Sequence, residues 1–184
     1  MSKLTTVAWI AHNLGLAASF GGILFGKIAL NGKLDVIDSK PDRGKLLNAA
    51  WNRYNAINVL SLGTAAATWF IGRAGISGQS IDEEARGLVL IKDVLFIVSA
   101  LTGLVSIIQG RSLTRQAPEG AVPIESGTTP APETSDEASR LLRSVNVLGN
   151  VNLVLIGAIE AVTTILAMKA NKSTRWSAVS RFLP

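Results

Sequence analysis

Apolar and polar positions alternate in long blocks, with apolar stretches at about residues 4–30, 50–72, 88–108 and 145–168. Each stretch approaches or exceeds the roughly 20 residues that a helix needs to cross the hydrocarbon core of a bilayer. A soluble four-helix bundle would instead show a charged face along the whole length of each helix. The pattern therefore predicts an all-α, integral membrane four-helix bundle in which residues 1–184 form a single four-span domain.

Signals for helix starts extend two of these helices beyond the membrane. Ser39 precedes Lys40-Pro41-Asp42, which places a proline in the first turn of the second helix. Thr134-Ser-Asp-Glu137 and Ser80-Ile-Asp-Glu83 have the form of capping boxes and predict the starts of the fourth and third helices. The second and fourth helices then begin about 10 residues before their apolar stretches, and both extend on the same side.

We call this extended side of the bundle the loop end, and the side that holds both termini the terminal end. At the loop end, residues 111–134 contain several prolines and few apolar residues, which predicts a flexible or extended linker. Residues 172–184 have basic and apolar positions at helical spacing, which predicts either a tail helix lying on the membrane surface or a frayed basic tail. Lys and Arg are more numerous at the loop end, which favours an N-out/C-out orientation.

Small and polar residues gather on one face of each apolar stretch when residues are placed about 100° apart. Small residues let membrane helices approach closely, and polar residues within a span face the bundle interior. On this basis Ala100 and Thr164 also face inward. The expected helix-packing glycines are Gly15, Gly22, Gly26, Gly103 and Gly157. The expected polar helix-packing layer toward the loop end consists of Asn55, Asn58, Asn146 and Asn150.

Three ionisable residues, His12, Asp93 and Glu160, fall on these inward faces at a depth of roughly 10 to 12 Å from the terminal end. An isolated carboxylate there costs a few kcal/mol, so each must be paired, protonated or functional. One interpretation is a proton-titrating or ligand site, or a metal site. The other is that His12 pairs with Asp93, while Glu160 takes a proton or bonds to Thr64 or Thr68, and that these contacts only fix helix register. Thr64 and Thr68 lie at the same level, whereas the neighbouring Lys92 is expected to extend its ammonium group to the interface.

Composition narrows the chemistry further. The chain has no cysteine, which excludes disulfides, Cys-ligated zinc, iron–sulfur clusters and thiol catalysis. Its one histidine excludes a bis-His haem within one chain, and no cofactor is predicted; a quinone, a tetrapyrrole or a metal ion remains an unsupported alternative. No phosphate-binding loop, dinucleotide fingerprint or nucleophile elbow is present, so an enzyme is the less favoured class. The net charge of +5 is spread over segments that flank the apolar stretches, which does not indicate nucleic-acid binding.

Residues 12–25 resemble the first helix of several small bacterial four-span families, including copper-resistance membrane proteins, but the chain lacks the ligands that follow in those families. The whole pattern predicts a small multi-pass protein of the bacterial inner (cytoplasmic) membrane. Its expected partners are the lipid bilayer and other membrane subunits or a second copy. The favoured function is an accessory or assembly subunit of a larger membrane complex. The alternatives are a small transporter or ligand-binding protein with a proton-coupled His/Asp/Glu site, and a quinone- or haem-linked oxidoreductase subunit.

Overall fold

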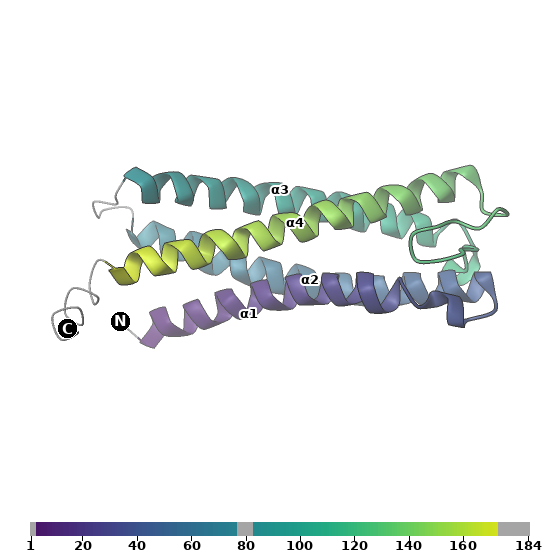
Figure 1. Cartoon of the computed structure of the whole chain (residues 1–184), viewed down its shortest axis with the longest axis horizontal. Coiled ribbons are helices and arrows are strands. Elements are labelled where there is room, and N and C mark those ends of the chain that lie inside the picture. The colour runs from purple at the N-terminus through teal and green to yellow at the C-terminus, as the bar shows by residue number, and fades with distance from the viewer. Residues whose placement is uncertain (1–2, 77–82, 173–184) are drawn as a thin grey trace, which may run out of the picture.

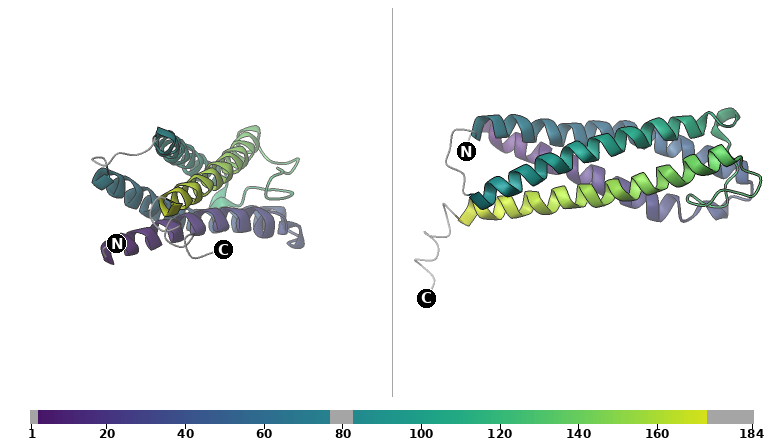
Figure 2. Two further views of the ribbon diagram at one scale, coloured as in Figure 1. Left: turned by 60° about the vertical axis from the view of Figure 1, so that its left-hand side comes forward. Right: turned by 90° about the horizontal axis from the view of Figure 1, so that it is seen from above.

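The computed structural model describes residues 3–76 and 83–172. Within these residues, four long helices form an elongated bundle (Figure 1), and they run side by side in every view (Figure 2). α1 packs mainly against α2, and α3 packs mainly against α4, so the bundle consists of two helical hairpins. The all-α four-helix bundle predicted from the sequence is therefore confirmed. The four helices are α1 (Lys3–Phe25), α2 (Lys40–Ile76), α3 (Glu83–Thr114) and α4 (Asp136–Lys172).

Three segments of the described residues are long and apolar enough to cross a membrane: Thr6–Leu30, Ala85–Thr114 and Asp136–Lys169. Large apolar side chains are exposed on the outside of these helices, as suits contact with lipid. The chain therefore has the character of a membrane protein. The predicted fourth span, 50–72, is not among the three, although α2 is as long as α4 at 37 residues. α2 is less apolar because it carries a run of polar residues toward the loop end, namely Asn48, Asn52, Arg53, Asn55 and Asn58.

The starts of α2 and α4 are fixed by serine side chains. The Ser39 hydroxyl accepts a hydrogen bond from the backbone N–H of Asp42 at 3.3 Å, as the sequence predicts. In α4 the corresponding acceptor is Ser135, whose hydroxyl lies 3.3 Å from the backbone nitrogen of Ala138, and not Thr134. The Thr134 hydroxyl instead donates to the carbonyl oxygen of Pro123. Most of the capping box predicted for α3 and nearly all of the predicted surface tail, residues 77–82 and 173–184, lie outside the described residues.

The connection between α3 and α4, residues 115–135, folds over the loop end and is not the expected flexible linker. Val122, Ile124 and Ala131 in this segment are buried. Val122 and Ile124 belong to a second hydrophobic cluster whose other buried members are Leu34, Leu47, Leu113, Ala138 and Leu142. The sequence pattern missed this packing because the apolar residues of the connection stand singly among prolines, without helical or strand periodicity.

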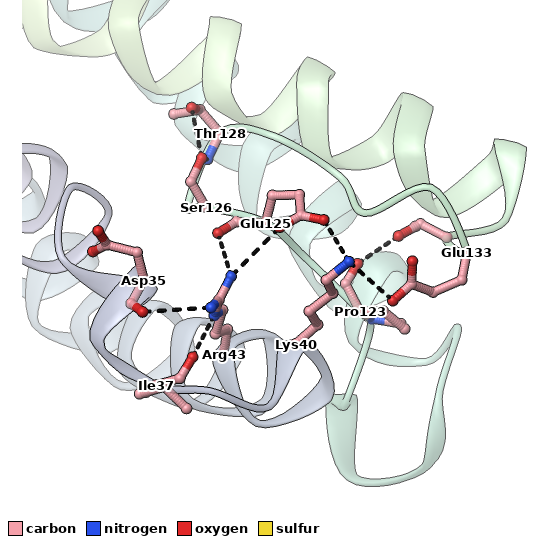
Figure 3. Close-up of polar contacts among 10 residues, drawn as sticks. Asp35, Ile37, Lys40, Arg43, Pro123, Glu125, Ser126, Thr128 and Glu133 are labelled. Atoms are coloured by element: carbon pink, nitrogen blue, oxygen red, sulfur yellow. Dashed lines mark hydrogen bonds and ion pairs between the residues drawn. The ribbon is translucent and has the colours of Figure 1, made fainter.

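Polar contacts fasten the same connection to the start of α2 (Figure 3). The guanidinium group of Arg43 donates to the carbonyl oxygens of Ile37 at 2.6 Å and Glu125 at 2.8 Å. Lys40 forms an ion pair with Glu125 at 2.6 Å, and this hydrogen bond raises the pKa of the Lys40 ammonium group. The α3–α4 connection and the α1–α2 loop are thereby joined into one ordered layer at the loop end.

The inward faces of the helices match the sequence pattern unevenly. In α1, His12, Gly15 and Ser19 are buried, and so is Gly26 in the π-helical turn that follows, as the small and polar pattern predicts. In α3 and α4 the buried faces are rotated relative to the prediction, and Ala100, Asn150 and Thr164 are exposed. A hydrogen bond from Ser99 on α3 to Asn152 on α4 holds these two helices in the observed orientation, and both residues are buried.

Candidate functional site

His12 lies at the centre of a polar cluster inside the bundle and is only 1% exposed. Its Nδ1 atom lies 2.8 Å from the carbonyl oxygen of Ala65 on α2. Because a carbonyl oxygen can only accept, Nδ1 carries the proton and donates it to this bond. Nε2 is then an acceptor, and the Nζ atom of Lys92 on α3 lies 2.9 Å from it. A neutral His12 therefore connects three helices, α1, α2 and α3.

Lys92 is fully buried, in contrast to the expectation that it reaches the interface. Its Nζ atom lies 3.9 Å from the ring centroid of Trp69, 5.9 Å from that of Phe96 and 6.0 Å from that of Trp9. The faces of aromatic rings attract a cation, most strongly where water is excluded. The ammonium group is thus held by three rings and one imidazole nitrogen, which explains why it turns into the bundle.

Asp93 is buried next to Lys92 in the sequence but has a different role from the predicted pairing with His12. Its Oδ1 atom accepts a hydrogen bond from the indole Nε1 of Trp69 at 2.8 Å. Both ring nitrogens of His12 are occupied by other groups. Asp93 therefore orients the Trp69 ring whose face lies over the Lys92 ammonium group.

Glu160 on α4 is a second carboxylate of the cluster, besides Asp93. It attracts the Lys92 ammonium group over a distance longer than an ion pair, because the ion pairs of the described residues do not include these two side chains. One buried oxygen of this carboxylate, Oε2, has no hydrogen-bond partner within the described residues. A buried carboxylate oxygen without a hydrogen-bond donor is costly, and such groups are often found where a proton or a ligand binds. The structure thus brings His12 and Glu160 together through Lys92, a residue that the sequence analysis assigned to the interface.

The two threonines predicted at this level, Thr64 and Thr68, differ in whether they contact His12. The hydroxyl of Thr68 lies 3.3 Å from His12 Nδ1 and donates to the carbonyl oxygens of Thr64 and Ala65 within α2. The hydroxyl of Thr64 donates to the carbonyl oxygen of Leu60 at 2.8 Å. Thr68 therefore lines the cluster, whereas the described contact of Thr64 is with its own helix.

The geometry of His12 also bears on metal and haem binding. Within the described residues, no group of three or more His, Cys, Asp or Glu side chains is arranged to hold a metal ion. His12 uses Nδ1 as a donor to Ala65 and Nε2 as the acceptor of the bond from Lys92. In this arrangement a haem iron or another metal would have to displace Lys92 before it could bind the imidazole.

A second polar region lies toward the loop end and contains several of the predicted asparagines. Asn146 accepts a hydrogen bond from Lys27 at 3.0 Å, and Asn58 lies 3.4 Å from the hydroxyl of Tyr54. Asn55 is half-buried, whereas Asn150 is exposed and does not join this layer. Helical spacing predicted Asn150 on the inward face with Asn146, but the observed rotation of α4 turns it outward and buries Asn152. These side chains, apart from Asn150, line a cavity of about 90 Å³ between the helices.

The glycines expected at helix contacts all lie where another side chain or backbone comes close. A Cβ atom on Gly15 would lie 2.4 Å from the carbonyl oxygen of Ser61, and one on Gly22 would lie 2.2 Å from the Tyr54 ring. The corresponding neighbours are Trp51 for Gly26 at 2.7 Å, Asn152 for Gly103 at 3.1 Å and Phe20 for Gly157 at 3.2 Å.

Comparison with models of protein families, with characterised proteins and with solved structures finds no match to this chain. The assignment of function therefore depends on the geometry of the residues.

Proposed function

We propose that this chain is a small proton-coupled membrane transporter in which Lys92, His12 and Glu160 form the proton-binding site. One observation carries the proposal. The buried Nζ atom of Lys92 lies 2.9 Å from a histidine nitrogen and attracts a carboxylate whose Oε2 atom has no hydrogen-bond partner within the described residues. Ionisable residues inside a membrane bundle are costly to bury and typically mark paths for ions, protons or substrates.

The proposed site can hold different numbers of protons. With Lys92 protonated, Glu160 and Asp93 ionised and His12 neutral, the four side chains carry one net negative charge, which is costly in an apolar interior and favours uptake of a proton. An added proton can go to the free Oε2 atom of Glu160 or to the imidazole nitrogen if Lys92 moves away. Either event removes this negative charge, and the change in charge provides a driving force for conformational change on protonation.

Proton flux in liposomes tests this proposal. The purified chain is reconstituted with a trapped pH-sensitive dye, and a pH gradient is imposed while amino acids, sugars, organic cations and inorganic anions are supplied in turn. We expect at least one class of solute to drive proton movement in the wild type. Glu160→Gln and His12→Ala should abolish that movement while circular dichroism shows unchanged helix content.

A matched control is Glu133→Gln, because Glu133 is an exposed carboxylate at the loop end. This variant should transport like the wild type. The proposal is rejected if Glu160→Gln and His12→Ala retain wild-type flux, or if no class of solute drives proton movement in the wild type.

A second candidate function, an accessory or assembly subunit of a larger membrane complex, is supported by the outer face of α2. This helix is less apolar than the three candidate spans and exposes Asn52 and Arg53. Gly63 and Gly72 have open space where a Cβ atom would lie, so a partner helix could approach α2 closely. Native mass spectrometry in mild detergent should show a second subunit that Gly63→Leu removes. A chain that is always monomeric rejects this function.

In either function we propose that α2 is a fourth span, covered partly by its neighbours, in a bacterial inner membrane. The excess of Lys and Arg toward the loop end supports an orientation with the terminal end outside. Single cysteines can be introduced at Lys33 and at Leu4, which are exposed at the loop end and the terminal end. In intact cells, a membrane-impermeant thiol reagent should label only the cysteine at Leu4.

A further inference from the structure

Lys27 is a second lysine within an apolar helix, and the local backbone places it between α1 and α4. It lies in a π-helical turn, Gly26–Leu30, whose closing hydrogen bond runs from the Asn31 N–H to the Gly26 carbonyl oxygen at 2.9 Å. Turns of this type are rare and frequently occur at functional sites. Gly149 on α4 leaves room for the side chain, because a Cβ atom there would lie 3.3 Å from Nζ of Lys27.

The ammonium group of Lys27 has only neutral hydrogen-bond partners within the described residues. Its Nζ atom donates to the side-chain oxygen of Asn146 at 3.0 Å and to the backbone oxygen of the same residue at 3.3 Å. The ion pairs of the described residues do not include it. A half-buried ammonium group without a counter-charge is unfavourable, and a bound anion would supply the missing charge.

The cavity beside Lys27 has the lining that an anion requires. It measures about 90 Å³, which exceeds the space needed for one water molecule several-fold. Lys27 is the one charged residue that lines it, and seven asparagines, including Asn55, Asn58 and Asn152, surround it. Each asparagine amide offers two N–H donors. A positive charge, many amide donors and no carboxylate favour an anion over a cation.

A route to the loop end is also present. A second cavity, of about 280 Å³, shares Lys27 and Asn31 with the first and is also lined by Asp35, Ser126 and Thr128. Asp35 is exposed and lines only this outer cavity. Lys27 therefore stands where the inner and outer cavities meet, within reach of an anion that enters from the loop end.

We infer that the asparagine-lined cavity is a binding site for a small monovalent inorganic anion, such as chloride or nitrate, with the Lys27 ammonium group as its counter-charge. The site is separate from the Lys92 cluster, and the inference does not depend on proton-coupled transport. Binding at Lys27 and proton flux through Glu160 can therefore succeed or fail independently.

Chloride binding to the purified full chain in detergent tests the inference through the line width of the chloride nuclear magnetic resonance signal. We expect saturable broadening with the wild type and its reversal by nitrate. Lys27→Gln should weaken binding about ten-fold or more, because it removes a charge-assisted hydrogen bond. Lys27→Arg should retain binding, and Lys33→Gln, at an exposed lysine outside both cavities, should match the wild type.

Any one of three results overturns the inference. The wild type shows no saturable broadening, Lys27→Gln binds chloride with the affinity of the wild type, or zwitterionic glycine displaces chloride as readily as nitrate does. If Lys27→Gln loses helix content, the Asn55→Leu variant is used to test chloride binding instead, because Asn55 is half-buried and lines the cavity. Weaker chloride binding in a folded Asn55→Leu supports the anion site, and unchanged binding rejects it.

Discussion

The charges of the buried cluster predict energetic coupling between Lys92 and Glu160. Replacing Lys92 with Met leaves the Glu160 carboxylate without its positive neighbour, and replacing Glu160 with Gln leaves the ammonium group without its negative neighbour. Removing one partner of a close buried ion pair costs roughly 3–5 kcal/mol. Lys92 and Glu160 are farther apart than such a pair and Glu160 is half-buried, so each single substitution should lower the free energy of unfolding by less, about 1–2 kcal/mol.

The double variant removes both charges and should recover most of this loss. It still leaves His12 Nε2 without its donor, which costs about 1–3 kcal/mol, and it loses the contact of the ammonium group with Trp69, worth about 2 kcal/mol. It no longer carries the penalty of burying two ions, which is several kcal/mol each. A methionine among the three rings adds favourable sulfur–aromatic contacts. The double variant should thus be close to the wild type in stability.

The assay is reversible unfolding in mixed micelles as the fraction of SDS is raised, followed by circular dichroism. The deciding quantity is the coupling free energy. It is the change in the free energy of unfolding of the double variant minus the sum of the changes in the two single variants. It should far exceed the roughly 0.6 kcal/mol typical of hydrogen bonds between membrane helices. The exposed Lys45–Glu119 ion pair provides a matched control cycle, in which the coupling should be small, below about 1 kcal/mol. Additive effects of Lys92→Met and Glu160→Gln would refute this electrostatic coupling.

Three predictions concern the loop end. Gly44→Ala should destabilise the protein by about 1–3 kcal/mol and speed amide hydrogen exchange in the α3–α4 connection, because the new Cβ atom would lie 1.8 Å from the carbonyl oxygen of Val122. Ser135→Ala should lower the free energy of unfolding by about 1 kcal/mol in the same SDS assay, since it removes the N-cap of α4. The hydrogen bond from Lys45 lowers the pKa of Glu119, so this pair should stabilise the connection fully above the ordinary glutamate pKa and less as the pH falls through the lowered value. Protection of the connection's amides, taken relative to the intrinsic exchange rate at each pH, should fall on acidification, and unchanged protection would contradict this last prediction.

Much of the fold could be predicted because it depends on features that lie close together in the sequence. The length of the apolar stretches identifies the helices, and Ser39 with the proline that follows it identifies one helix start. The inward face of α1 was also predictable, because His12, Gly15 and Ser19 share helical spacing with no competing polar face. In each case the deciding residues are separated by one or two helical turns.

The position of Lys92 could not be predicted in this way. Lys92 and Asp93 are adjacent and both buried, and the side chain that reaches the centre of the bundle depends on the rotation of α3. That rotation is set by residues distant in the sequence, namely the Trp69 ring on α2 and the Ser99–Asn152 hydrogen bond to α4. The general tendency of lysine to extend toward water therefore gave the wrong answer at a site where aromatic rings replace water.

Buried apolar side chains lie between the two polar regions of the bundle. Between these regions lies a hydrophobic cluster to which Leu16 on α1 and Ile156 on α4 belong, and Phe96 of the same cluster lies on its Lys92 side. Because the side chains of this cluster are almost fully buried, an ion entering from the loop end would meet hydrocarbon before it reached Lys92. A transporter requires such a barrier on one side of its site at any moment. The helix hairpins α1–α2 and α3–α4 meet across this cluster, so the proposed transporter would have to move one hairpin relative to the other to open it.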